Sequence, residues 1–281
     1  MIKTIVLALS DSITCGEIEE FKKNYPEIDI KEMDINEIDR IKFLEKGTLS
    51  ECMLITDCVD WYLFSEDYKI PYLIYFHEGN RNCSFEKAKY GIETLHMLEL
   101  QFLERVYQRF KGIPWKIIET KRCIIREITV NDVEALYEIY KDPKITEFTE
   151  DLLNDMDEEK EYTRQYIRTV YAFYEFGMWI IEDIKTGELI GRAGISCREG
   201  FEEPELGYVI GTSFQNKGYA TEVCSAILKY AMEELGFYKI RALIQNGNYI
   251  SMKLCGKLGF VFEKEVPIGT QVMKQYIWNV S

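Results

Sequence analysis

Residues 205–222 read ELGYVIGTSFQNKGYATE, and this stretch decides how the second half of the chain folds. Its first six residues have the apolar character of a buried strand, and an amphipathic helix begins near Tyr219 after a loop that contains glycine. The first turn of a helix presents free backbone N–H groups, and the helix dipole favours an anion there. Gly218 has no side chain to keep a phosphate away from these groups. The order of strand, glycine turn and helix therefore predicts a diphosphate-binding site.

The residues of the turn support this prediction in different ways. Lys217 can add a charge-assisted hydrogen bond to a phosphate, and Ala220 keeps the next point of approach small. Taken alone, the pattern also fits an ordinary capped loop, so the surrounding elements must decide between the two interpretations. The predicted diphosphate-binding residues are Gln215, Lys217, Gly218, Tyr219, Ala220 and Thr221.

The surrounding elements indicate an α+β domain with a largely antiparallel sheet. Residues 178–184 and 189–195 flank a short Lys-Thr-Gly loop, a pattern typical of a β-hairpin. Residues 239–244 supply a strand after the helix, and Asn248 begins another helix. The predicted diphosphate turn therefore lies between strands of one sheet.

From Glu119 to about residue 279 the chain resembles the GNAT acetyltransferases, in the branch that includes the ribosomal-protein N-acetyltransferases. The resemblance implies a GNAT domain over residues 115–281, with a mixed, mainly antiparallel splayed sheet flanked by helices. It also implies acetyl-CoA as co-substrate, bound at the predicted turn. The segments that carry it, in order, are ETKRCIIREI at 119–128, LGY at 206–208, QNKGYA at 215–220, NYIS at 248–251 and KLGF at 257–260.

The resemblance also implies where the reaction takes place. In GNAT folds the strand that matches residues 205–210 splays from the strand that matches 239–244, and the pantetheine arm pairs with the exposed edge. Backbone groups of Val209 and Ile210 are then expected to hold this arm. A primary amine, on a small molecule or at a peptide N-terminus, attacks the acetyl carbonyl directly in a ternary complex.

An attacking ammonium group must first lose a proton, so the site needs a carboxylate or a water chain. Glu205, on the splayed strand, is the first candidate for this base, with Glu203 and Glu222 as alternatives. The other interpretation of Glu205 is a surface residue of the strand. The base therefore stays open between these carboxylates and water.

The leaving CoA thiolate needs a proton donor. Many GNAT enzymes have a tyrosine seven positions after the asparagine that matches Asn248, but Cys255 stands there in this chain. Like the ribosomal-protein branch, the chain has a serine three positions after Asn248, so we expect Ser251 to be the donor and Asn248 to contact the cofactor. Alternatively, Asn248 only caps the helix and Ser251 fills its first turn. We interpret Cys255 as a buried helix thiol.

Residues 157–174 are predicted to form a helix that is rich in aromatic residues. In the GNAT fold the matching region borders the acceptor pocket, so some of these rings could hold a cationic substrate through their faces. For most of them we expect core packing. The residues concerned are Tyr162, Tyr166, Tyr171, Phe173 and Tyr174.

Residues 1–112 have the pattern of a small α/β three-layer domain, in which short apolar runs alternate with helical stretches. Gly112-Ile113-Pro114 marks the predicted boundary with the GNAT domain. Leu95 and Leu98 belong to the apolar stripe of the last predicted helix. The predicted strands are residues 4–9, 52–56 and 71–76, and the predicted helices are residues 16–24, 35–44, 61–68 and 85–110.

Residues 53–75 weakly resemble the late strand–helix–strand unit of haloacid-dehalogenase-like folds. That family has a DxDx[TV] nucleophile motif after an early strand, whereas Ser10-Asp11-Ser12 stands here with a single aspartate. Asp57 and Asp60 could hold a metal, or Asp57 could cap the helix that follows its strand. We therefore expect residues 1–112 to be a non-catalytic scaffold or a lid on the substrate side.

The composition argues against several partners. The formal net charge is −14, and an acidic surface repels nucleic-acid backbones and anionic lipids. The acidic charge either serves solubility alone or also concentrates cationic amines. No window approaches the ~20 apolar residues of a membrane helix. Eight cysteines without a CxxC pair indicate buried thiols in a reducing compartment. We therefore expect a cytoplasmic enzyme that uses no metal and binds neither nucleic acid nor membrane.

Two other functions stay open. A CoA-sensing or interaction module could keep the cofactor turn without turnover, which the missing tyrosine makes credible. Residues 1–112 could instead be a metal-dependent phosphohydrolase. Binding of acetyl-CoA without turnover on any amine would indicate the sensing module, whereas turnover would indicate an acetyltransferase. Magnesium-dependent phosphate release by residues 1–112 would indicate the phosphohydrolase.

Overall fold

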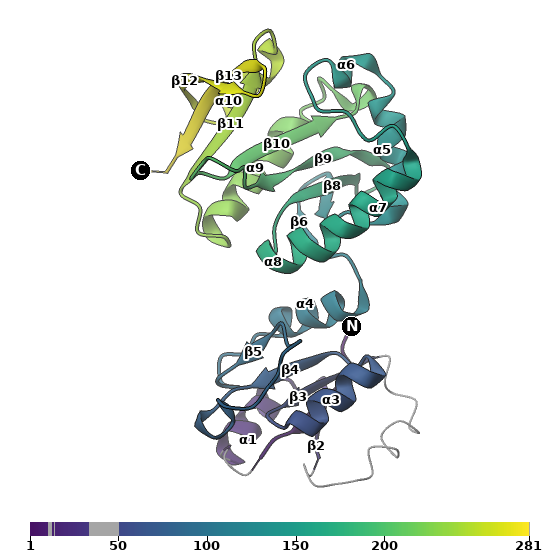
Figure 1. Cartoon of the computed structure of the whole chain (residues 1–281), viewed down its shortest axis with the longest axis vertical. Helices are drawn as coiled ribbons and strands as arrows, with labels where there is room; N and C mark the ends of the chain where they lie inside the picture. The colour runs from purple at the N-terminus through teal and green to yellow at the C-terminus, as the bar shows by residue number, and fades with distance from the viewer. Residues whose placement is uncertain (11–12, 14, 34–50, 281) are drawn as a thin grey trace. The chain divides into compact units, whose positions relative to one another are not determined.

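The computed structural model describes residues 1–10, 13, 15–33 and 51–280 (Figure 1). The chain divides into two compact units, Met1–Ile113 and Pro114–Ser281. Helix α4 (Leu100–Lys111) precedes the division, and Gly112 ends it with a φ of 65°. The helix predicted at residues 35–44 lies outside the described residues. No helix in the described ranges combines the length and the apolar character that a membrane span requires.

The described residues of the first unit form a parallel sheet in the order β2-β1-β3-β4-β5. Every residue of β1 and β3 is buried, as expected for parallel strands that are covered on both faces. Helices α1 and α4 pack on one face through Phe21 and Leu103, and α3 packs on the other through Trp61. The strands are β1 Thr4–Ala8, β2 Asp29–Glu32, β3 Cys52–Thr56, β4 Tyr72–Tyr75 and β5 Gly91–Ile92, and the helices before α4 are α1 Cys15–Asn24 and α3 Val59–Tyr68.

The long helix predicted at residues 85–110 is wrong in its first half. Helix α4 begins only at Leu100, and upstream of it Gly91–Ile92 forms the edge strand β5 beside β4. Leu95 is fully buried, but its N–H donates to Glu17 Oε1 at 2.7 Å rather than to a helical carbonyl. The spacing of Leu95 and Leu98 therefore reflects the burial of a non-helical segment.

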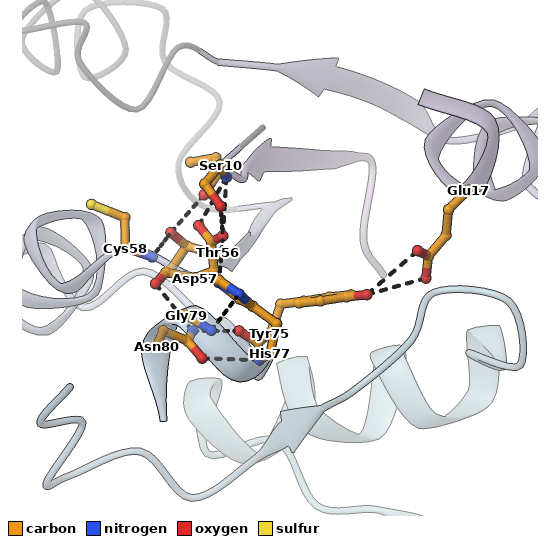
Figure 2. A network of polar contacts seen from close by, with 10 residues as sticks. Ser10, Glu17, Thr56, Asp57, Cys58, Tyr75, His77, Gly79 and Asn80 are labelled. Atoms are coloured by element: carbon orange, nitrogen blue, oxygen red, sulfur yellow. Dashed lines mark hydrogen bonds and ion pairs between the residues drawn. The ribbon is translucent and has the colours of Figure 1, made fainter. Parts of the chain in front are cut away.

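A hydrogen-bonded network joins the carboxyl ends of β1, β3 and β4 (Figure 2). Asp57, directly after β3, accepts hydrogen bonds from the Ser10 N–H at 3.0 Å and from the Ser10 hydroxyl at 2.5 Å. His77, after β4, has its Nε2 atom 3.1 Å from Asp57 Oδ2. His77 Nδ1 accepts a hydrogen bond from the Gly79 N–H, so the proton of the neutral ring lies on Nε2 and is donated to Asp57.

This network differs from both roles considered for Asp57. Helix α3 has Cys58 as its N-cap and no side-chain cap, so Asp57 does not cap the following helix. The Asp57 side chain is 2% exposed, and Ser10 and His77 occupy its oxygens. Among the residues that the structure describes, no group of three or more His, Cys, Asp or Glu side chains could hold a metal ion. Asp57 therefore ties three strand ends together.

The described residues of the second unit form an eight-stranded sheet in the order β12-β13-β11-β10-β9-β8-β7-β6. Neighbouring strands are antiparallel except β10 and β11. Along β8, Trp179 and Ile181 belong to the main core with α9, whereas Ile180 belongs to a second cluster with α5 on the opposite face. The strands are β6 Lys116–Glu119, β7 Cys123–Arg126, β8 Met178–Asp183, β9 Leu189–Ser196, β10 Glu205–Ile210, β11 Lys239–Gln245, β12 Val261–Ile268 and β13 Gln271–Asn279, and the helices are α5 Val133–Tyr140, α6 Pro143–Thr146, α7 Met156–Tyr166, α8 Ala172–Tyr174, α9 Tyr219–Glu233 and α10 Tyr249–Lys257.

Strands β10 and β11 are joined at a single register position. Glu205 pairs with Arg241, and beyond this position the two strands separate (Figure 1). On its other side β10 stays paired with β9 along its whole length. Gly191 of β9 permits a close approach there, since a Cβ atom at this position would lie 2.0 Å from the Val209 carbonyl oxygen. The splay that the GNAT resemblance implies is therefore present between the two expected strands.

Most elements predicted for this unit occur where the sequence places them. Strands β8 to β11 agree with their predicted ranges to within one residue. The helix predicted at residues 157–174 is interrupted, because α7 ends at Tyr166 and a π-helical turn, Ile167–Tyr171, precedes α8. The hairpin of β12 and β13 has no counterpart among the predicted elements.

Asp57→Asn is expected to destabilise the first unit. The amide keeps the shape of the side chain but places an N–H₂ group against the donors Ser10 and His77. We expect the free energy of unfolding of this unit to fall by about 2–3 kcal/mol, because buried donors lose their acceptor. Urea denaturation of the full chain, followed by circular dichroism, measures the change. Asp67→Asn, the same change at an exposed position of α3, is the control, and equal stability of the two variants would contradict the expectation.

Candidate active site

A cavity of about 660 Å³ lies where β10 and β11 separate. Residues 205–209 of β10 and 242–245 of β11 line it. Tyr140 of α5 and Phe148, which follows α6, line it as well. The predicted site residues that meet at this cavity are Glu205, Val209, Asn248 and Ser251.

Glu205 lines the cavity at the single junction of β10 with β11. Its side chain is 13% exposed, and Oε2 accepts a hydrogen bond from Arg198 Nε at 3.0 Å. Arg241 Nε lies 3.4 Å from the same oxygen, and the Arg241 side chain is fully buried against the ring of Phe201. No described residue donates a hydrogen bond to Glu205 Oε1. Two arginines therefore fix one oxygen of Glu205 and leave the other available to a ligand.

The two alternative bases are paired outside the cavity. Glu203 pairs with Lys239 at 2.6 Å, and this ion pair holds the pKa of Glu203 below its usual value. Glu222 pairs with Arg122 Nε, also at 2.6 Å. Neither carboxylate lines the cavity, so Glu205 is the residue of the three that a substrate in this cavity could reach.

Ser251 lines the cavity beside Tyr208. The Ser251 Oγ atom and the Tyr208 phenol oxygen are 2.8 Å apart, so one hydroxyl donates a hydrogen bond to the other. Asn248 Oδ1 accepts a hydrogen bond from the Ser251 N–H at 3.1 Å, which makes Asn248 the N-cap of α10. Burial raises the pKa of Tyr208, so its phenol is protonated at neutral pH. Ser251 therefore has a neutral hydroxyl partner within the site.

Cys255 also lines the cavity, one helical turn beyond Ser251. It is 3% exposed, and burial raises the pKa of its thiol to about 12. Such a thiol is protonated at neutral pH, and the protonated form is a poor nucleophile. Cys255 is therefore the buried helix thiol that its position in the sequence indicates.

The predicted diphosphate turn connects β10 to α9 and lies outside the lining of this cavity. Gly218 is the N-cap of α9 with a φ of 83°, and no described side chain caps the helix there. Ala220 and Thr221 follow in the first helical turn and are half-buried. The exposed Gly218 thus leaves the first backbone N–H groups of α9 open to an anion.

The side chains of the turn differ in what they contact. Gln215 Nε2 donates to the Ile210 carbonyl at 2.9 Å and ties the turn to the end of β10. Lys217 is exposed, with its ammonium nitrogen 5.8 Å from the ring centre of Phe214, and it forms no ion pair with a described carboxylate. Lys217 is therefore the side chain of the turn that is available to bind a phosphate.

Arg122 braces the same turn, a role that sequence reasoning missed. Its guanidinium stacks 4.1 Å from the ring centre of Tyr219, and its Nη1 atom donates to the Lys217 carbonyl at 3.0 Å. Tyr219 in turn donates its hydroxyl to Asp183 at 3.2 Å. The side chain of Tyr219 is therefore held by the protein, and its backbone N–H is the group it can offer to a ligand.

The aromatic residues of the interrupted helix do not line the cavity, so the packing role is the one of the two considered that the structure supports. Tyr171 is fully buried and donates its hydroxyl to the Met178 carbonyl at 2.5 Å. Tyr166 accepts a hydrogen bond from the Met178 N–H at 2.8 Å. Both side chains fix the start of β8, so core packing and strand anchoring are the roles that the structure shows. The residues absent from the lining are Tyr162, Tyr166, Tyr171, Phe173 and Tyr174.

Tyr208 and Arg192 line the cavity but received no role from the sequence. Arg192 stands in the middle of β9 between the buried residues Ile190 and Ala193, and a charge within an apolar strand is a signal that could have marked it. The contact of Tyr208 with Ser251 depends on how α10 packs on the sheet, and no local pattern encodes that packing.

The second unit is similar to known acetyltransferases in sequence. Residues 122–261 match the family model described as an acetyltransferase (GNAT) domain. The uncharacterized N-acetyltransferase YoaA of Bacillus subtilis (strain 168) is 32% identical over 167 residues, which cover 58% of this chain and 89% of YoaA. The match to YoaA thus extends over nearly the whole relative.

Solved structures share the fold of this unit. A protein of Vibrio cholerae, provisionally named as a ribosomal-protein-serine acetyltransferase, has a TM-score of 0.52 and 20% identity, covering 59% of this chain and 98% of its own. The microcin C7 self-immunity acetyltransferase MccE, solved in complex with acetyl-CoA and AMP, has a TM-score of 0.50 and 13% identity, covering 59% of this chain and 99% of its own. At these identities the likeness concerns the fold alone.

Sequence and structure agree on the second unit. The family model, a relative at 32% identity and the splayed mixed sheet all concern the same residues. The chain therefore belongs to the GNAT acetyltransferase family, and it is an acyltransferase.

Proposed function

We propose that the chain transfers an acetyl group from acetyl-CoA to a primary amine by direct attack in a ternary complex. The observation that carries this proposal is the cavity at the separation of β10 and β11, which Glu205 and Ser251 both line. The separation leaves an edge of β10 near Val209 and Ile210 without a neighbouring strand, and an extended pantetheine arm can pair with such an edge. Cys255 is a protonated thiol, which argues against an acyl-enzyme.

The uncapped start of α9 is proposed to bind the diphosphate of acetyl-CoA. Its backbone N–H groups and the exposed Lys217 supply the donors, and Gly218 leaves room for the phosphates. Asn248 lines the cavity and is proposed to contact the cofactor in addition to capping α10. The fold neighbour MccE, which is in complex with acetyl-CoA, supports this choice of co-substrate.

The proposed chemistry assigns both proton transfers to residues of the cavity. A bond forms from the amine nitrogen to the acetyl carbon while the bond from that carbon to sulfur breaks. Glu205 takes the amine proton on Oε1, directly or through water. Ser251 gives its hydroxyl proton to the leaving thiolate and recovers one from solvent, while Tyr208, 2.8 Å away, hydrogen-bonds to the Ser251 oxygen and orients it. Because burial raises the pKa of Tyr208, the phenol keeps its own proton throughout the reaction.

Residues 115–281 are proposed to act alone in catalysis, in the branch of the ribosomal-protein N-acetyltransferases. The acceptor is then a small amine or a peptide N-terminus. Residues 1–112 are proposed to be a non-catalytic domain, because Ser10 and His77 already occupy the oxygens of its buried Asp57. Because Cys255 stands where many GNAT enzymes have a tyrosine, the second candidate is a CoA-sensing module, which would bind acetyl-CoA in calorimetry and release no thiol with any amine.

Gly218→Glu is expected to abolish binding of acetyl-CoA, measured by calorimetry. The new carboxylate would stand where we place the diphosphate, and the φ of 83° adds a strain of about 1–2 kcal/mol to the fold. Gly236→Glu is the matched control, since Gly236 also has a positive φ, at 70°, with open space around it. Unchanged affinity of Gly218→Glu would place the diphosphate elsewhere.

Ser251→Ala is expected to lower kcat about 100-fold and to leave the affinity for acetyl-CoA unchanged, because it removes a proton donor and not a cofactor contact. The cap of α10 survives, since Asn248 bonds to the backbone N–H of this residue. Tyr208→Phe is expected to give a smaller loss, because Ser251 remains. Thiol release is the measurement, and Ser225→Ala, on the exposed side of α9, is the control. Full activity of Ser251→Ala would assign the donor to another group.

Glu205→Gln is expected to lower kcat/KM about 100-fold or more at neutral pH, because the amide cannot take the amine proton. The activity that remains is expected to rise with pH as free amine becomes available. Glu203→Gln, which changes a carboxylate outside the cavity, is the control. If both variants kept the unmodified rate in a thiol-release assay, water would be the base.

A further inference from the structure

Arg192 is the basic residue of the cavity that has no acidic partner. It stands in the middle of β9 in register with Val209 of β10 and is half-buried. No carboxylate of the described residues lies within 4.0 Å of it, and its buried Nε atom has no hydrogen-bond partner there. The guanidinium carbon lies 5.0 Å from the ring centre of Tyr140. Tyr140 interacts with the cation through its ring and its hydroxyl, and the buried Nε–H group of Arg192 is left without a hydrogen-bond partner.

Among the arginines of the second unit, the lack of a carboxylate partner is specific to Arg192; Arg241 also has buried nitrogens without a hydrogen-bond partner, but it lies beside Glu205. Every other arginine of the second unit forms an ion pair with a carboxylate, and Arg198, the other arginine in the cavity, pairs with Glu205. An unpaired buried cation lowers stability because its desolvation is not compensated. A planar guanidinium with free N–H groups binds a carboxylate in a bidentate manner. The Arg192 guanidinium is therefore suited to bind a ligand that carries a carboxylate.

Arg192 is also on the wrong face of the sheet to bind the diphosphate of acetyl-CoA. Val209, its partner in register, and Tyr140 belong to the cluster that packs α5 on the sheet. Helix α9, whose N-terminus is the proposed diphosphate site, packs on the opposite face with the main core. An anion at Arg192 therefore belongs to the acceptor side of the cavity.

Carboxylates without a partner line the same cavity. Glu147 and Glu150, at and after the end of α6, are exposed and form no ion pair with a described basic residue. Glu205 has its free Oε1 atom here as well. The cavity thus offers an unpaired guanidinium and unpaired carboxylates, which together complement a molecule that carries both charges.

We propose that the acceptor is an amine that also carries a carboxylate, and that Arg192 binds this carboxylate while the ammonium group lies toward Glu205. A free α-amino acid fits this description, and so does a peptide N-terminus with an acidic side chain beside it. The proposal rests on the proposed acetyl transfer to an amine and names its substrate class. The acceptor is then zwitterionic, whereas the net charge of the chain alone suggested a cationic one.

The test compares acceptors that differ only in the carboxylate. The full chain is assayed for thiol release from acetyl-CoA with free α-amino acids against the matching amino-acid amides, and with tripeptides that have Glu or Gln at the second position. We expect kcat/KM to be about tenfold higher for the carboxylate-bearing member of a pair. The pair with the higher kcat/KM identifies whether the carboxylate comes from an amino acid or from a peptide side chain.

Arg192→Gln is expected to remove this preference by raising KM for the carboxylate-bearing acceptor, so that the ratio of kcat/KM between the two members of a pair falls to about one. Arg192→Lys is expected to restore part of the preference, because it returns the charge without the planar fork. Arg164→Gln, which alters an exposed arginine of α7, is the control. Arg192→Gln leaves no carboxylate unpaired, so its resistance to urea should equal or exceed that of the unmodified chain.

The outcomes separate this inference from the proposed function. Equal kcat/KM for both members of every pair would overturn the inference and leave acetyl transfer to amines standing. If no amine is acetylated, the proposed function fails, and calorimetry of the CoA-loaded chain with amino acids and amides decides on Arg192. Tighter binding of amino acids that Arg192→Gln loses and Arg164→Gln keeps would support the inference, and equal binding of both ligands would overturn it.

Discussion

The geometry of the candidate active site depends on the pairing of Glu205 with Arg241. It is the single register position that connects β10 with β11, and the cavity opens directly beyond it. Arg241 is fully buried, so its charge is stable there only while Glu205 lies beside it. The same carboxylate that closes the sheet therefore faces the cavity. This gives Glu205 a structural role through Oε2, while Oε1 accepts no hydrogen bond from a described residue.

The pairing of charged side chains around the cavity also depends on Glu205. Glu205 faces both Arg198 and Arg241, and the two guanidiniums meet the same oxygen. One carboxylate is thus shared by two cations, and it forms no ion pair with Arg192 on the next strand. The cavity is acidic at Glu147 and basic at Arg192 although the chain as a whole is strongly acidic. The net charge of the chain therefore does not describe the charge distribution within the cavity, which local ion pairing sets.

The sequence predicted the second unit well wherever local patterns decide the structure. Strand Glu205–Ile210 and the start of α9 follow from alternation, glycine and the first helical turn, all encoded within a few residues. The contact of Tyr208 with Ser251 and the unpaired state of Arg192 depend on residues far apart in the chain, and no spacing encodes them. In the first unit the apolar spacing around Leu95 predicted a helix, but Glu17 binds its N–H and a non-helical segment forms instead.

The two polar clusters of the chain show how a structural network differs from a binding site. In the first unit, Ser10 and His77 occupy the oxygens of buried Asp57, so binding a ligand there would first break hydrogen bonds that hold three strands together (Figure 2). In the second unit Arg192 has a buried donor without an acceptor, so a ligand that supplies one adds a bond and breaks none. A complete network stabilises the fold at the expense of reactivity. An incomplete one lowers stability until a ligand completes it, and this difference supports the proposal that the chemistry lies in the second unit.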